Sequence, residues 1–157
     1  NFDIVICIGV IHHLENPKLA IEKLIKATKK GGKLVIWVYG YEGNEWIKKY
    51  IDPVRFFTSR LQLPMVNFIS AIITIFLLAF LKLVPPKRTY LKQISKFSFW
   101  HVHSIIFDQL IPKIARYWTK EEALSLLKTR PNISRIRIYH TNDNSWTLIG
   151  TKLRPIL

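Results

Sequence analysis

An uncharged apolar run in the middle of the chain restricts the folds open to it more than any other feature. Residues 61–81 carry no charge, and the apolar stretch 65–84 has prolines at both ends. Twenty helical residues are about 30 Å long, close to the thickness of a bilayer core. A true transmembrane span here would put residues 1–60 and residues 86–157 on opposite sides of a membrane.

Strands are predicted on both sides of this run. Residues 2–8 and 34–38 are almost entirely apolar and rich in β-branched side chains, as expected for parallel strands buried on both faces. Residues 133–140 alternate strictly, which predicts a half-exposed strand with 145–153 as its hairpin partner. We expect strands from both sides of the run to share one sheet, which a transmembrane span would forbid. Two interpretations of the apolar helix stay open: a protein-covered cap, or a helix that dips into one leaflet.

Helix signals accompany these strands. Asn16 is an N-cap candidate followed by Pro17, and Gly31-Gly32 is expected to end this helix. The pattern T-K-E-E at 119–122 is a capping box, which predicts a second helix before the hairpin. Strand, helix and strand within about forty residues predict a βαβ unit with a right-handed crossover.

Several of these segments together resemble a known family. They read F-D-I-V-I at 2–6, G-V-I-H-H-L at 9–14, Asn16-Pro17, and G-G-K-L at 31–34. This combination resembles the second half of class I S-adenosylmethionine-dependent methyltransferases. The capped helix and the closing hairpin resemble the family's last helix and last two strands.

The resemblance implies an α/β fold and a division of the chain. The expected architecture is a partial Rossmann-like methyltransferase sheet, a βαβ unit followed by a helix and an antiparallel hairpin, with a helical insert. Residues 1–40 and 107–157 would form the C-terminal half of the methyltransferase core. Residues 41–106 would form a helical lid, with its apolar helix at about 65–84.

The N-terminal half of that family is not visible in this chain. Gly9 is the first glycine, and no G-x-G-x-x-G is present. In the family, the glycine-rich loop and the acidic residue that binds the ribose hydroxyls precede the strand that resembles residues 2–8. The resemblance therefore implies a C-terminal fragment that is inactive alone.

Site residues follow from the same resemblance. Ligands of open parallel sheets bind beyond the carboxyl ends of the strands, and Ile8, Gly9 and Val10 are the expected contacts to S-adenosylmethionine there. His12 and His13 are the candidate catalytic residues, which would orient an acceptor or take its proton. The alternative is that one of these histidines only packs against or caps the loop. A metal role together with Glu15, His101 and His103 is disfavoured, because no zinc-enzyme spacing is present.

Two further segments are candidates for binding the acceptor. One follows the second strand, and the other leads into the last helix. The alternative for both is structural: the first would anchor the insert, and the second would pack in the core. The candidate substrate-binding residues are Tyr39, Tyr41, Asn44, Trp46, Arg116 and Tyr117.

Charge is distributed unevenly along the chain. There are 24 Lys and Arg against 10 Asp and Glu, a formal net charge of +14, yet no acidic residue lies between Asp52 and Asp108. A basic frame around an apolar run is typical of a helix at an anionic membrane surface, which we expect as a partner. We disfavour nucleic acid, because no helix-turn-helix or RNA-binding aromatic signature is apparent. The basic residues of this frame are Arg55, Arg60, Lys82, Lys87, Arg88, Lys92 and Lys96.

The sequence thus predicts part of a methyltransferase that acts on a small or lipophilic acceptor. The alternative is a membrane-peripheral, catalytically inactive binding module with a methyltransferase-like core. A single cysteine, Cys7, excludes a disulfide framework and favours a reducing compartment. We therefore expect a cytoplasmic protein, peripheral to the membrane.

Overall fold

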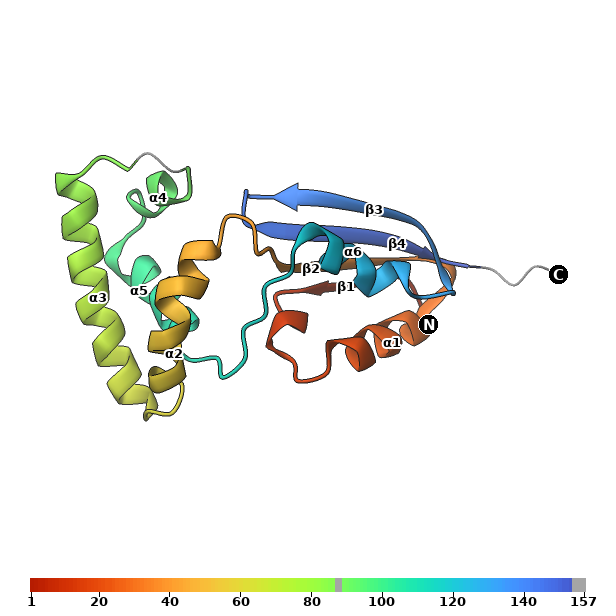
Figure 1. Ribbon diagram of the computed structural model, residues 1–157, viewed down its shortest axis with the longest axis horizontal. Coiled ribbons are helices and arrows are strands. Elements are labelled where there is room, and N and C mark those ends of the chain that lie inside the picture. The colour runs from red at the N-terminus through yellow and green to blue at the C-terminus, as the bar shows by residue number, and fades with distance from the viewer. Residues whose placement is uncertain (87–88, 154–157) are drawn as a thin grey trace. The chain divides into compact units, whose positions relative to one another are not determined.

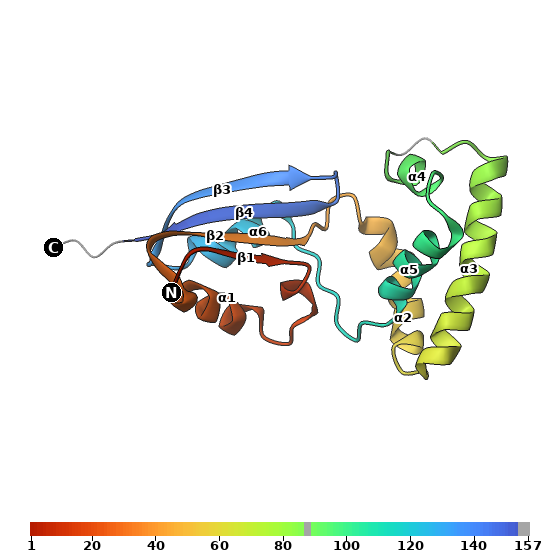
Figure 2. The ribbon, with the colours of Figure 1, turned by 180° about the vertical axis from the view of Figure 1, so that it is seen from behind.

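The computed structural model describes residues 1–86 and 89–153, and it divides into two compact units. The sheet unit comprises Asn1–Glu45 and Ile114–Leu157, and the helical unit comprises Trp46–Lys113. Figures 1 and 2 label the elements of both units. Residues 87–88 of the basic frame and residues 154–157 of the predicted C-terminal segment lie outside the described residues.

The sheet unit is built on a four-stranded mixed sheet with the order β1-β2-β4-β3. β1 runs parallel to β2, and β4 pairs antiparallel with both β2 and β3. The predicted βαβ unit and the closing hairpin are therefore confirmed, and strands from before and after the apolar run share one sheet. The strands are β1 (Phe2–Ile8), β2 (Thr28–Tyr39), β3 (Ile133–Thr141) and β4 (Ser145–Lys152).

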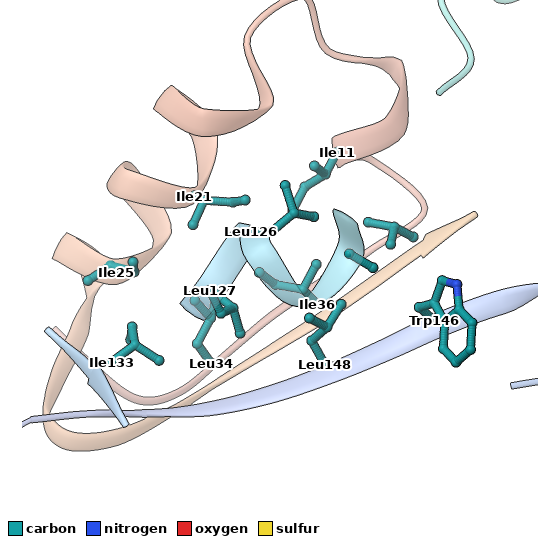
Figure 3. Packing of buried hydrophobic residues seen from close by; sticks show 12 residues of the cluster. Ile11, Ile21, Ile25, Leu34, Ile36, Leu126, Leu127, Ile133, Trp146 and Leu148 are labelled. Atoms are coloured by element: carbon teal, nitrogen blue, oxygen red, sulfur yellow. The ribbon is translucent and has the colours of Figure 1, made fainter. Parts of the chain in front are cut away.

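One face of this sheet carries the main hydrophobic core. It packs against α1 (Pro17–Ala27), which connects β1 to β2, and against α6 (Lys120–Lys128), which precedes the hairpin. Figure 3 shows side chains from both helices and from the strands meeting in this layer. The buried residues of the cluster are Ile11, Ile21, Ile25, Leu34, Ile36, Val38, Ala123, Leu126, Leu127, Ile133, Trp146 and Leu148.

The beginnings of both helices agree with the sequence signals. The Asn16 side chain accepts a hydrogen bond from the Leu19 amide, and Pro17 is the first helical residue. Thr119 and Glu122 form the complete capping box of α6.

The end of α1 differs from the prediction. The helix ends at Ala27 rather than at Gly31-Gly32, because Thr28 already has extended backbone and pairs with Phe2 at the start of β2. Where the glycines lie, the β1–β2 register is irregular. A Cβ on Gly32 would stand 2.9 Å from the carbonyl oxygens of both Asp3 and Lys29. The glycine pair therefore allows this irregular strand pairing and does not end the helix.

The prediction that β1 is buried on both faces was wrong. Ile4, Ile6 and Ile8 are 58%, 61% and 61% exposed, although Val5 and Cys7 on the other side pack against the core. β1 is an edge strand, and α1 and α6 cover only one face of the sheet. In the part of the chain that the structure describes, β1 is therefore an apolar strand with one uncovered face and one free edge.

The helical unit contains the apolar run as one long helix. Its elements are η2 (Ile47–Ile51), α2 (Asp52–Thr58), α3 (Leu63–Leu83), α4 (Thr89–Ile94) and α5 (Phe99–Leu110). α3 packs alongside α5 in Figures 1 and 2. Among the described residues, α3 is the helix long and apolar enough to cross a membrane.

A buried arginine holds α2 to the end of α5. The Arg55 guanidinium donates to the Gln109 carbonyl oxygen at 2.6 Å and to the Asp52 carboxylate at 2.6 Å. Thr58 donates its hydroxyl to the Leu110 carbonyl oxygen at 2.9 Å. These bonds join α2 to the end of α5, and α3 begins a few residues after α2.

Candidate functional site

The candidate site begins where β1 ends. Gly9 follows the strand with φ +73, a conformation that favours glycine, and a Cβ there would meet nothing within 4 Å. Backbone conformation and not crowding therefore calls for glycine at this position. The chain then enters η1 (Ile11–His13), which turns both histidines over the carboxyl end of the sheet.

Aromatic rings from three segments of the sheet unit meet at this end. The His12 ring stacks on the Tyr39 ring with centroids 3.8 Å apart, and the Tyr39 ring stacks on that of Tyr117 at 5.5 Å. Trp37 and His13 approach the His12 ring edge-on, at 5.9 and 4.2 Å. We refer to His12, His13, Trp37, Tyr39 and Tyr117 as the aromatic cluster.

His12 is the buried polar group of this cluster. Its side chain is 1% exposed, and neither ring nitrogen has a hydrogen-bond partner among the described residues. Burial, reinforced by the neighbouring His13, lowers the pKa of His12 to about 3. The imidazole is therefore neutral at neutral pH, with one donor and one acceptor nitrogen unused. Such a group is a weak base, but it is well suited to hold a polar atom of a ligand.

The segment before α6 is held to the loop around η1 by contacts with backbone carbonyl oxygens. His13 Nδ1 lies 2.7 Å from the Ile114 carbonyl oxygen, and the Arg116 amide donates to the His12 carbonyl oxygen at 3.0 Å. The Arg116 guanidinium donates to the Glu15 carbonyl oxygen at 3.0 Å. Arg116 therefore holds the loop between β1 and α1, which contains both histidines. Its neighbour Tyr117 belongs to the aromatic cluster.

Polar groups of the loop after β2 donate hydrogen bonds that hold this loop in place. Asn44 is buried, and its amide donates to the carbonyl oxygens of Gly40 and Asn144, at 2.8 and 2.6 Å. Tyr41 is exposed, and its backbone amide donates to the Trp118 carbonyl oxygen. The Asn44 amide group is thus committed to the loop.

Glu42 has a comparable anchoring role in that loop. Its carboxylate accepts hydrogen bonds from the Trp146 indole at 3.1 Å and from the Lys120 amide at 3.0 Å. Burial alone would raise the pKa of Glu42, but its hydrogen bonds outweigh this and lower the pKa below its ordinary value.

The structure thus separates the predicted site residues into groups. His12, His13, Tyr39 and Tyr117 meet in the aromatic cluster, whereas Trp46 belongs to the helical unit. Ile8 and Val10, the expected cofactor contacts, expose apolar side chains on either side of Gly9. In residues 1–86 and 89–153, no three His, Cys, Asp or Glu side chains are grouped so as to hold a metal ion.

Sequence reasoning missed one member of the cluster. Trp37 precedes Tyr39 by two residues on β2, so both side chains leave the same face of the sheet near its carboxyl end. That spacing, read together with the end of the strand, is the signal that identifies it.

Comparison with protein families places the beginning of the chain in context. Residues 1–36 match the family described as a methyltransferase domain. The match spans β1, η1, α1 and most of β2, and it supports a methyltransferase domain in this part of the chain. No curated protein matches the chain.

Proposed function

We propose that the chain is part of a methyltransferase that transfers a methyl group from S-adenosylmethionine to a small or lipophilic acceptor. The observation that carries this proposal is the aromatic cluster around buried His12. It lies at the carboxyl ends of two parallel strands, within and beside the segment that matches the methyltransferase family.

S-adenosylmethionine, when bound, would supply an electrophilic methyl group on a positively charged sulfur. Ile8, Gly9 and Val10 would contact it, because they form an exposed apolar loop at the strand end where such ligands bind. The unused His12 nitrogens add a polar contact within the aromatic cluster.

In this proposal His12 is a positioning group and not a strong base. Its low pKa keeps the ring neutral, so it can hydrogen-bond an acceptor hydroxyl or amine without competing for the proton. Methyl transfer is an in-line displacement, and alignment in a site that excludes water supplies much of its rate. The stacked rings of Tyr39 and Tyr117 would provide the apolar wall.

We also propose that this chain forms the C-terminal part of a Rossmann-like sheet that continues beyond β1. The exposed side chains of Ile4, Ile6 and Ile8, on a strand whose second edge is free among the described residues, support this. Exposed, apolar edge strands invite aggregation, so proteins usually cover them. The adenosyl group would be held mainly by the preceding half.

A second candidate is a membrane-peripheral binding module with a methyltransferase-like core and no catalysis. The wide exposed apolar face of α3 favours it, because such a face suits a bilayer surface. Both candidates are consistent with a cytoplasmic location at the membrane periphery, which we propose as well.

Transfer of labelled methyl groups distinguishes the two candidates. The complete protein, including what precedes this segment, is incubated with methyl-labelled S-adenosylmethionine and separate aqueous and lipid extracts. We expect labelled product, and we expect His12→Phe to lower its rate at least about tenfold. His140→Phe, which alters an exposed histidine of β3 outside the cluster, should leave the rate unchanged. Cofactor binding without any labelled product would favour the inactive module, and unchanged transfer by His12→Phe would remove His12 from the site.

A further inference from the structure

The long helix α3 buries small polar side chains and exposes large apolar ones. Ser70 and Thr74 are fully buried, whereas Phe68 and Phe76 are 67% and 71% exposed. Only 17% of its most apolar window is buried. Val66 and Leu81 are buried on the same helix. The helix therefore differs from one packed on a soluble core, whose large apolar side chains face inward.

The buried polar stripe of α3 contacts α5. His103 Nε2 on α5 lies 3.2 Å from the Asn67 carbonyl oxygen, and the Thr74 hydroxyl donates to the Ser70 carbonyl oxygen at 2.7 Å. Nearer the other end of α3, Leu81 packs with Val102 of α5. Polar groups between helices and apolar groups outside them are the arrangement found in lipid surroundings.

Apart from Leu63 at its first turn, the strongly exposed apolar residues of α3 form one continuous face. Spacings of three and four residues place them along the same side of the helix. Leaving such side chains in water forgoes about 1.5–3 kcal/mol for each one that an apolar environment would bury. We call this set the outer face of α3: Met65, Phe68, Ile72, Ile75, Phe76, Phe80 and Leu83.

The exposed face of α5 is mainly polar, in contrast to the outer face of α3. His101, Ser104 and Asp108 are exposed at helical spacing, next to Trp100. Charged and polar groups there suit water or lipid headgroups, while tryptophan favours the membrane–water boundary. α3 therefore provides the longest row of exposed apolar side chains in the described part of the helical unit, and Phe56, Phe57 and Trp100 are exposed apart from it.

α3 does not fit a transmembrane orientation. β2 precedes it and β4 follows it, and these strands pair from Lys33–Thr151 to Tyr39–Ser145, so the chain must return to the side from which it left. The returning helix α5 has 12 residues, about 18 Å, against the ~30 Å of a bilayer core. α3 therefore fits a helix that lies in the plane of the interface.

The charged residues around α3 indicate what kind of surface its outer face would contact. Residues 53–107 contain no acidic residue, and exposed bases occur before α3 at Arg60, near its end at Lys82, and after it at Lys92 and Lys96. Lysine and arginine near an anionic bilayer contribute about 1 kcal/mol each. An acidic protein partner would satisfy these charges but not the wide apolar face between them.

We propose that α3 lies in the headgroup region of an anionic phospholipid bilayer, with its outer face toward the acyl chains and the polar face of α5 toward water. This inference is independent of methyl transfer, because it rests on the helical unit and on the pairing of β2 with β4, and not on the aromatic cluster.

Vesicle flotation tests this proposal without any cofactor. The protein is mixed with vesicles of phosphatidylcholine alone or with added phosphatidylglycerol. We expect flotation with the anionic vesicles, a loss of at least about tenfold in Phe76→Asp, and little change in Ser104→Asp. The two variants add the same charge to exposed positions on opposite sides of the unit. Equal flotation of the Phe76→Asp and original proteins, equal losses in both variants, or equal binding to neutral vesicles would overturn the proposal.

A fluorescent label reports on the same face even where a charged variant fails to fold. A single cysteine replaces Phe76 or Ser104 in a Cys7→Ala background and carries an environment-sensitive fluorophore. We expect anionic vesicles to shift the emission to shorter wavelengths at position 76 and not at position 104. A label at position 76 that is already shielded without vesicles, in a protein that sediments as a dimer, would assign the face to a second copy and overturn the membrane proposal.

Discussion

At the residue scale, His12 determines what the candidate site can do chemically. A buried imidazole with two unsatisfied nitrogens is costly, about 1–3 kcal/mol for each lost hydrogen bond. A fold that needed His12 only for packing would be served as well by phenylalanine. The cost is consistent with a ligand that completes these hydrogen bonds.

The buried state of His12 makes folding pH-dependent. Its pKa falls from 6.5 to about 3 on folding, so between these values the unfolded chain binds more protons than the folded one. The free energy of unfolding should therefore fall as the pH is lowered through this window, by up to about 1.4 kcal/mol per pH unit. Urea titrations between pH 7 and pH 4 are expected to show a clearly shallower slope for His12→Phe. Parallel slopes for the two proteins would contradict the buried, neutral state.

Much of the site was predictable from residues near strand ends. His12, His13 and Tyr39 follow β1 or end β2, and the carboxyl ends of parallel strands are adjacent. Asn44 shows the limit of such reasoning, because the hydrogen bond to Asn144 joins residues far apart in sequence. A polar residue in a loop looks the same in sequence whether its partner is a ligand or a distant carbonyl group.

At the element scale, helix starts were readable and one helix end was not. Capping by Asn16 and Thr119 is local and leaves a short pattern in the sequence. The end of α1 depends on pairing between Thr28 and Phe2, which no local pattern records. The glycine pair after the helix therefore suggested a C-cap. The structure instead requires it for the irregular pairing of β1 with β2.

This explanation of the glycine pair makes a testable prediction. Gly32→Ala would place a methyl group against two backbone carbonyl oxygens, so we expect it to lower the free energy of unfolding by about 1–3 kcal/mol. Gly9→Ala meets open space and should cost only the backbone conformation, about 1 kcal/mol. Chemical denaturation of both variants measures the difference. A neutral Gly32→Ala would show that the crowding is relieved at no cost.

At the scale of the whole molecule, exposure of β1 could not be read from composition. A run of isoleucine and valine predicts burial on both faces, whether the cover comes from this segment or from another. Among the residues of the sheet unit up to Leu153, helices cover β1 on one face, and the side chains on its other face are exposed. The same reasoning applies to α3, whose composition alone fits a cap and a membrane helix equally well.

Coverage of β1 in the complete protein can be tested by one charge. Ile6→Lys is expected to destabilise the complete protein by about 2–4 kcal/mol, because it would bury an unpaired ammonium against the added layer. Leu19→Lys, at an exposed position of α1, should change stability by less than about 0.5 kcal/mol. Thermal or urea unfolding of the two variants decides the matter. Equal, small effects would mean that the face of β1 stays in water.

The most direct test of the central claim is to find where the cofactor binds. Radiolabelled S-adenosylmethionine is crosslinked to the complete protein by ultraviolet light, and tryptic peptides are identified by mass spectrometry. We expect label in residues 1–18, which hold Gly9 and His12, and in residues 34–48, which hold Tyr39, with loss of label when S-adenosylhomocysteine competes. Label confined to other peptides, or label that S-adenosylhomocysteine does not displace, would contradict a methyl-transfer site at the aromatic cluster.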